Sequence, residues 1–128
     1  MLAAWEREHT AAMIDRVEEV PAADRLRELI GGAFGLGSSG ERGRAERAVL
    51  AAAEDPLVAP VVARVHRSRI DYLEGLFSAA GLPKVRARAR ARIAYAAYLG
   101  NLLLAEREPS VEAGRLMVDE LIAMFARG

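Results

Sequence analysis

The chain has no cysteine, only two histidines, and aromatic residues at just 5% of its 128 positions. Without cysteine, a disulfide framework, a thiolate metal site and a cysteine nucleophile are all excluded. The two histidines, His9 and His66, do not have the close spacing of metal ligands, so we predict neither a metal nor another cofactor. The lack of cysteine also suits a reducing compartment, and we expect the protein in the cytoplasm.

An excess of charge, a long apolar run and a targeting signal are missing as well. Eighteen basic residues balance eighteen acidic ones. Because phosphate binding needs a clustered excess of Lys and Arg, this balance argues against a free-standing nucleic-acid binder. No apolar run reaches the roughly 18 residues of a membrane span, and no basic region followed by an apolar stretch opens the chain. We therefore expect a soluble protein without membrane contact.

What the chain does contain, in every long segment, is Ala, Leu, Arg and Glu, the strongest helix formers. At this length the chain fits one domain, residues 1–128, which on folding buries about two thirds of its surface. Clusters of Gly, Pro and Ser interrupt the helical periodicity. We expect an all-α fold, a six-helix bundle with helices at about 2–19, 21–34, 38–53, 55–81, 84–105 and from 110 to the C-terminus.

The fourth of these helices has local signals at both ends. Asp55 before Pro56 is typical of an N-cap followed by proline in the first turn, so we expect the helix to begin there. Pro60 follows one turn later, where it must leave a carbonyl unpaired or bend the entry. Gly81 with Pro83 after it is typical of a helix C-terminus.

The fifth helix contains an alternation of Arg and Ala over residues 85–92 that resembles a β-strand pattern. We interpret it as a helix, because alanine forms helices well and strands poorly. The four arginines then divide between two sides of the helix, which favours a solvated, salt-bridged surface over a nucleic-acid-binding patch. On a helical wheel one apolar face gathers Ala87, Ala91, Ala94, Tyr95, Tyr98 and Leu102.

The last two helices are apolar over more than one stripe. A surface helix needs only one buried face, so the extra apolar surface predicts a second partner. Gly100 and Gly114 lie inside these helices at a cost of about 1 kcal/mol each relative to Ala, which close approach of another backbone would offset. We predict a homodimer with a four-helix interface, two helices from each subunit. Its residues are Leu99, Gly100, Leu103, Gly114, Met117, Leu121 and Phe125.

The helix order, the Ala-Glu-Asp-Pro start of the fourth helix, its Ala80-Gly81 end and the stretch Arg88–Gly100 together resemble the C-terminal domain of TetR-family transcriptional regulators. The resemblance covers essentially the whole chain. It implies a bacterial regulator in which a small, often apolar ligand binds among the helices. Residues 1–19 resemble the later part of the helix that connects such a domain to its helix-turn-helix head. That head is missing from this chain, so DNA would be bound only through a domain not present here.

Candidate pocket residues come from the first, second, fourth and fifth helices. Trp5, His9 and Met13 recur every four residues and so share one side of the first helix. They line a ligand pocket or, alternatively, form an ordinary core stripe. Tyr95 and Tyr98 offer hydroxyls to a ligand, or else are interface aromatics. The full predicted pocket is Trp5, His9, Met13, Phe34, His66, Ile70, Tyr95 and Tyr98.

No pattern of catalytic residues is present, so we do not expect an enzyme. We find no nucleophile with a base and no carboxylate pair in an apolar setting. The stretch Gly35–Gly40 follows a helix and lacks the Gly-Lys-Ser/Thr ending of a phosphate-binding loop. The sequence thus favours an effector-sensing and dimerisation domain of TetR type, whose small-molecule ligand controls DNA binding in the intact regulator. The alternative is a homodimeric helical interaction module with no small-molecule ligand.

Overall fold

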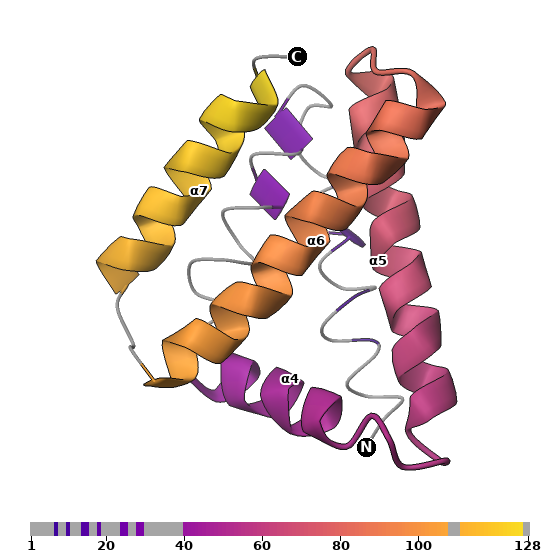
Figure 1. Cartoon of the computed structure of the whole chain (residues 1–128), viewed down its shortest axis with the longest axis vertical. Coiled ribbons are helices and arrows are strands. Elements are labelled where there is room, and N and C mark those ends of the chain that lie inside the picture. The colour runs from indigo at the N-terminus through magenta and orange to yellow at the C-terminus, as the bar shows by residue number, and fades with distance from the viewer. Residues whose placement is uncertain are drawn as a thin grey trace.

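The computed structural model describes residues 7, 10, 14–15, 18, 24–25, 28–29, 40–107 and 111–126. Those residues form four helices and no strand: α4 (Gly40–Ala51), α5 (Ala59–Ala79), α6 (Lys84–Arg107) and α7 (Val111–Ala126) (Figure 1). The all-α expectation is therefore confirmed. The four helices correspond to the third to sixth predicted segments. The first two segments lie mostly outside the described residues, so the count of six helices stays a prediction.

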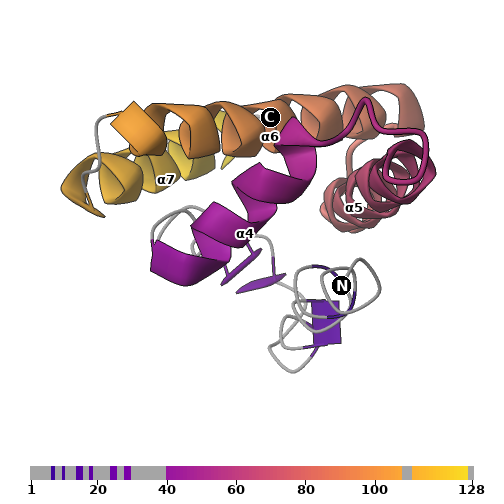
Figure 2. The same cartoon turned by 90° about the horizontal axis from the view of Figure 1, so that it is seen from below.

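Helix α6 is the central helix of the described part, and α5, α6 and α7 form one layer (Figure 1). Helix α5 packs along α6, and α7 lies on the other side of α6 in the same layer (Figure 1). Helix α4 lies on one side of that layer, and no described helix covers the opposite side of α6 and α7 (Figure 2). Among the described helices, not one is both long and apolar enough to cross a membrane.

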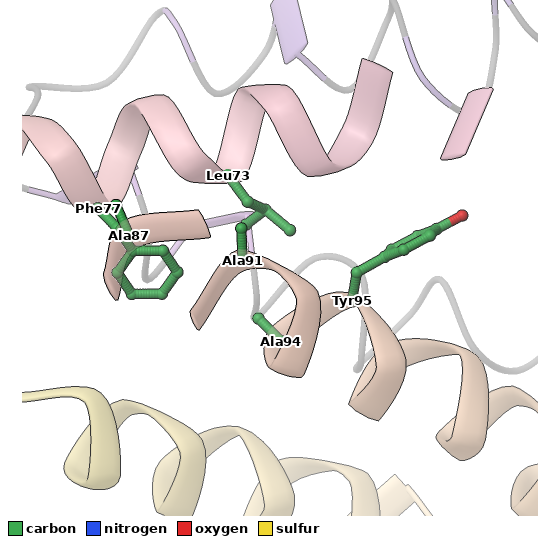
Figure 3. Packing of buried hydrophobic residues seen from close by; sticks show 6 residues of the cluster. All are labelled: Leu73, Phe77, Ala87, Ala91, Ala94 and Tyr95. Atoms are coloured by element: carbon green, nitrogen blue, oxygen red, sulfur yellow. The ribbon is translucent and has the colours of Figure 1, made fainter. Parts of the chain in front are cut away.

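The main core lies between α5 and α6 and depends on small side chains. Leu73 and Phe77 of α5 fit against alanines of α6, as Figure 3 shows, and because alanine is small the two helices approach closely. Phe125 of α7 adds an edge-to-face ring contact to Phe77, with centroids 5.1 Å apart. The buried hydrophobic positions of α6 are Ala87, Ala91, Ala94, Tyr95 and Leu102. The helical interpretation of the Arg-Ala alternation and its predicted apolar face are thus confirmed.

Helix α5 begins one turn later than the sequence signals suggest, at Ala59 rather than at Pro56. The Asp55 carboxylate accepts a hydrogen bond from the Leu57 amide at 2.8 Å, and the Asp55 carbonyl accepts from the Ala59 amide at 2.9 Å. These bonds make a turn ahead of the helix. The predicted start was wrong because Pro60 has no N–H and is tolerated only in the first turn, where it now lies.

Gly81 ends helix α5 with a φ of 105°, which L-residues rarely adopt. The Leu82 amide then donates to the Phe77 carbonyl at 3.2 Å, as in a Schellman cap. We expect Gly81→Ala to lower the free energy of unfolding by about 1–2 kcal/mol, measured by urea titration. Gly75→Ala is the matched control: Gly75 lies inside α5 with open space around an added Cβ, so it should raise stability by up to about 1 kcal/mol. If both substitutions change the free energy of unfolding equally, Gly81 is not needed for its positive φ.

The arginines at the start of α6 tie the helices together at the surface. Arg88 contacts Asp71 at 2.5 Å and Glu74 at 2.8 Å, both on α5. Arg90 donates to the Phe125 carbonyl at 2.7 Å and so caps the C-terminal end of α7. The salt-bridged surface predicted for this run is confirmed at Arg88.

Candidate functional site

A buried polar cluster lies where helices α4, α5 and α6 meet, and we call it the Arg69 cluster. It comprises Thr10, Glu46 of α4, His66 and Arg69 of α5, and Tyr95 and Tyr98 of α6. The Glu46 side chain is completely buried and that of Arg69 is 11% exposed. A charged pair this deep in a small helical domain is unusual, since charged side chains are rarely buried unless paired.

Arg69 is the centre of the cluster and joins four segments of the chain. Its Nη1 and Nη2 donate to the two carboxylate oxygens of Glu46, in the bidentate geometry that favours arginine over lysine. Its Nε donates to the Thr10 hydroxyl at 3.0 Å. Nη1 also approaches the Tyr95 hydroxyl at 3.3 Å. One guanidinium therefore connects α5 to α4, to α6 and to Thr10.

Two tyrosines of α6 form an aromatic wall beside this guanidinium. The rings of Tyr95 and Tyr98 are stacked with centroids 6.0 Å apart, and Arg69 lies within 5.9 Å of both centroids. That distance is within the range of cation–π attraction. Tyr98 also hydrogen-bonds Glu46, so each member of the ion pair contacts a tyrosine of α6: Arg69 contacts Tyr95, and Glu46 contacts Tyr98.

Burial and charge in the cluster shift the pKa values of its groups. Burial alone would lower the pKa of Arg69, but the hydrogen bond and charge of Glu46 outweigh it, and the pKa rises above its ordinary value. Burial raises the pKa of Tyr95, opposed by the nearby Arg69, and burial with the Glu46 charge raises that of Tyr98. At neutral pH Arg69 is therefore charged and both tyrosines keep their protons.

His66 continues the hydrogen-bonded chain, with its Nδ1 2.5 Å from the Tyr95 hydroxyl and the rings edge-to-face. The Tyr95 oxygen already accepts from Arg69, so its own proton is directed to a neutral His66. Burial, followed by the Arg69 charge, lowers the pKa of His66 below 6.5, against the opposing effect of Glu46. The geometry and the pKa direction agree on a neutral imidazole.

This lowered pKa makes the stability depend on pH through His66. A neutral imidazole is favoured in the folded state, so its contribution is fully present above the unfolded pKa of 6.5 and is lost as pH falls through the folded pKa. We expect the midpoint of urea unfolding to fall between about pH 7.5 and pH 5.5, and to fall less in His66→Gln. If the unfolding midpoint depends on pH equally in wild type and in His66→Gln, the lowered pKa of His66 is contradicted.

The structure brings together three of the predicted pocket residues, His66, Tyr95 and Tyr98, as one contact group. Ile70, the fourth predicted pocket residue that the structure describes, packs against the α5–α6 core instead. The remaining predictions lie outside the described residues: Trp5, His9, Met13 and Phe34.

The predicted interface residues divide into two groups. Leu103 is exposed and Gly100 has open space around it among the described atoms. Leu99 and Phe125 pack against the α5–α6 core, while Met117 and Leu121 pack with Val118 between α6 and α7. Gly114 is buried. A role in dimer contact stays a prediction for all seven.

Sequence reasoning missed Glu46, Arg69 and Asn101. A signal for the pair was present, because each charge interrupts an apolar stripe of its own helix. Arg69 follows Val62 and Val65 and precedes Leu73 at helical spacing, and Glu46 precedes Val49. Charges of opposite sign on two core-facing stripes indicate a buried pair.

Asn101 of α6 is a further buried polar residue, 6% exposed. Within the part of the chain that the structure describes, its Nδ2 has no hydrogen-bond acceptor. An unpaired buried donor costs about 1–3 kcal/mol, which makes this amide an exception that needs an explanation.

Elsewhere, a surface hollow is lined by Asp71, Glu74, Lys84, Val85 and Arg88. It contains none of the predicted pocket residues, and its Arg88 is held by the carboxylates of Asp71 and Glu74. No group of three potential metal ligands occurs among the described residues.

A second surface feature is an exposed apolar face on α6 and α7. Its large side chains are Ile93 and Leu104 of α6 and Leu116 and Met124 of α7, each between 53% and 59% exposed. On α6 the spacing 93, 97, 100, 104 repeats every three to four residues. Such spacing is typical of a helix seam that packs against other helices.

Compared with known proteins, the chain matches no family model, no curated protein and no solved structure.

Proposed function

We propose that this chain is a dimeric sensor domain in which a small molecule binds beside the Arg69 cluster. The observation that carries the proposal is the buried cluster itself, with His66, Tyr95 and Tyr98 in contact and Asn101 Nδ2, one turn further along α6, without an acceptor among the described residues. Ligand sites are typically apolar and contain a few convergent polar groups with shifted pKa values. The cluster supplies such groups in a core made mostly of valine, leucine and alanine.

The position of the cluster suits a sensor, because it joins helices that a ligand can move relative to one another. Arg69 contacts α4, α6 and Thr10 through one guanidinium. A ligand that changes any of these contacts changes the relative free energy of two helix arrangements. A buried ion pair contributes little net stability compared with apolar packing, so its presence favours a role in conformation.

The exposed face of α6 and α7 supports the dimer. Figure 2 shows that α4 leaves one side of the α6–α7 layer open, and four large apolar side chains of these two helices are exposed. Gly100 occupies the centre of the α6 stripe, where no described atom lies within 4 Å of an added Cβ. Another helix can therefore approach closely at this point. A second copy of the chain offers the same face and gives a four-helix interface.

A ligand-binding dimer of this kind is also what the resemblance to TetR-family regulators implies. In such a regulator the ligand-bound and ligand-free dimers would hold two DNA-reading heads at different separations. Half-sites one DNA turn apart need about 34–36 Å between the heads, so a small change at the cluster is sufficient to abolish operator binding. In the proposed intact protein, DNA would be bound by the heads alone.

The test is extraction of small molecules from purified protein, followed by mass spectrometry. The control is the double variant Glu46→Leu/Arg69→Met, which removes both charges and leaves the α6–α7 face unchanged. We expect a compound enriched in wild type and depleted in the control. A wild-type dimer with no enriched compound would overturn the sensor and favour the interaction module.

A further inference from the structure

The Asn101 side-chain amide is the one polar group of the described core that Glu46, Arg69 and their partners leave unsatisfied. It lies three residues after Tyr98, so both project from the same side of α6, about one turn apart. Tyr98 is committed to Glu46 and to stacking on Tyr95. Leu102 beside it is almost fully buried. Asn101 thus presents an N–H in a mainly apolar part of the core, next to the cluster.

The charges nearby indicate what kind of acceptor this N–H would receive. Glu46 and Arg69 carry one negative and one positive charge that cancel in a bidentate pair. His66 is neutral because its pKa is lowered by burial and by Arg69. An anionic ligand would meet the buried Glu46 carboxylate with the described cation already paired to it. An uncharged oxygen acceptor satisfies the amide without that repulsion.

Resting on the proposed sensor function, we propose that the ligand is an uncharged, largely apolar molecule whose carbonyl oxygen accepts a hydrogen bond from Asn101 Nδ2. Ketones, esters, lactones and amides belong to this class. The bond fixes the orientation of the ligand and its apolar body contacts the surrounding core. A site that hydrogen-bonds its ligand discriminates strongly against an analogue lacking that group, because the protein donor is then left unpaired.

The experiment uses three matched probes on the full chain: cyclohexanone, methylcyclohexane and cyclohexanecarboxylate. Binding is followed by the ¹H–¹⁵N signals of the Asn101 side-chain amide and of the α6 backbone. We expect cyclohexanone to shift the Asn101 amide signal in a saturable way, and the hydrocarbon and the carboxylate to bind at least about 10-fold more weakly. Tighter binding of the carboxylate than of the ketone would overturn the proposal.

Asn101→Leu is the variant that separates this inference from the proposed function. Leucine has nearly the same size and no donor, so the variant should lose the preference for cyclohexanone over methylcyclohexane. Without a ligand it should unfold at a higher temperature than wild type, because an unpaired buried donor has been removed. If ketone preference survives in the variant, the Asn101 inference fails and the sensor remains. If no probe and no cellular compound binds wild type, the sensor itself fails.

Discussion

Glu46→Leu lowers the free energy of unfolding by about 3–5 kcal/mol, the expected cost of leaving a buried charge without its partner. Arg69 is 11% exposed, so water cannot replace the lost carboxylate. Adding Arg69→Met removes the orphaned charge and should return the stability to within about 1–2 kcal/mol of wild type. Both values are measured by urea unfolding of the purified variants.

The comparison of single and double variants is the informative part. A large single effect with recovery in the double variant shows that the two side chains act as one unit. Arg88→Met is the matched control, because Arg88 also contacts two carboxylates but at the surface, and it should lower the stability far less than Glu46→Leu does. A Glu46→Leu effect as small as that of the control would contradict a buried pair.

Leu104→Asp is expected to convert the proposed dimer to a monomer without unfolding the chain. Leu104 is 59% exposed within one subunit, so the substitution costs the isolated subunit little. In a symmetric dimer the new carboxylate appears twice in an apolar interface, which should raise the dissociation constant at least about 100-fold. Analytical ultracentrifugation measures the constant, and circular dichroism checks that the helices remain.

The control for this variant is Leu57→Asp. Leu57 is 82% exposed, on the turn between α4 and α5 and away from the α6–α7 face, so the oligomeric state should not change. A Leu104→Asp protein that dimerises as tightly as wild type would place the interface elsewhere.

The sequence predicted the described helices well where composition and periodicity agree. The Arg-Ala stretch became α6 because alanine favours a helix and its wheel gathers one apolar face, and the Gly81 end of α5 was correct because only glycine readily adopts that φ. The start of α5 was misplaced because two prolines competed for the first turn. Local signals alone did not show which of them the helix would accept.

The buried Arg69 cluster was only half predictable. His66, Tyr95 and Tyr98 stood out as polar or aromatic residues on apolar faces, and they do meet. Glu46 and Arg69 are common residues in helices, and their pairing depends on how α4 crosses α5, which no local pattern specifies. That Asn101 Nδ2 finds no acceptor in the described part of the chain is likewise a property of tertiary packing. Residue type suggested which side chains take part, whereas their relative positions could be known only from the tertiary structure.

The central claim, a dimer that holds a small molecule in each subunit, is tested most directly by native mass spectrometry of the chain purified from cells. The account predicts a complex of two chains carrying an added low-mass species, which dissociates on activation to leave the bare dimer. A single chain with no added mass would contradict both the interface and the sensor.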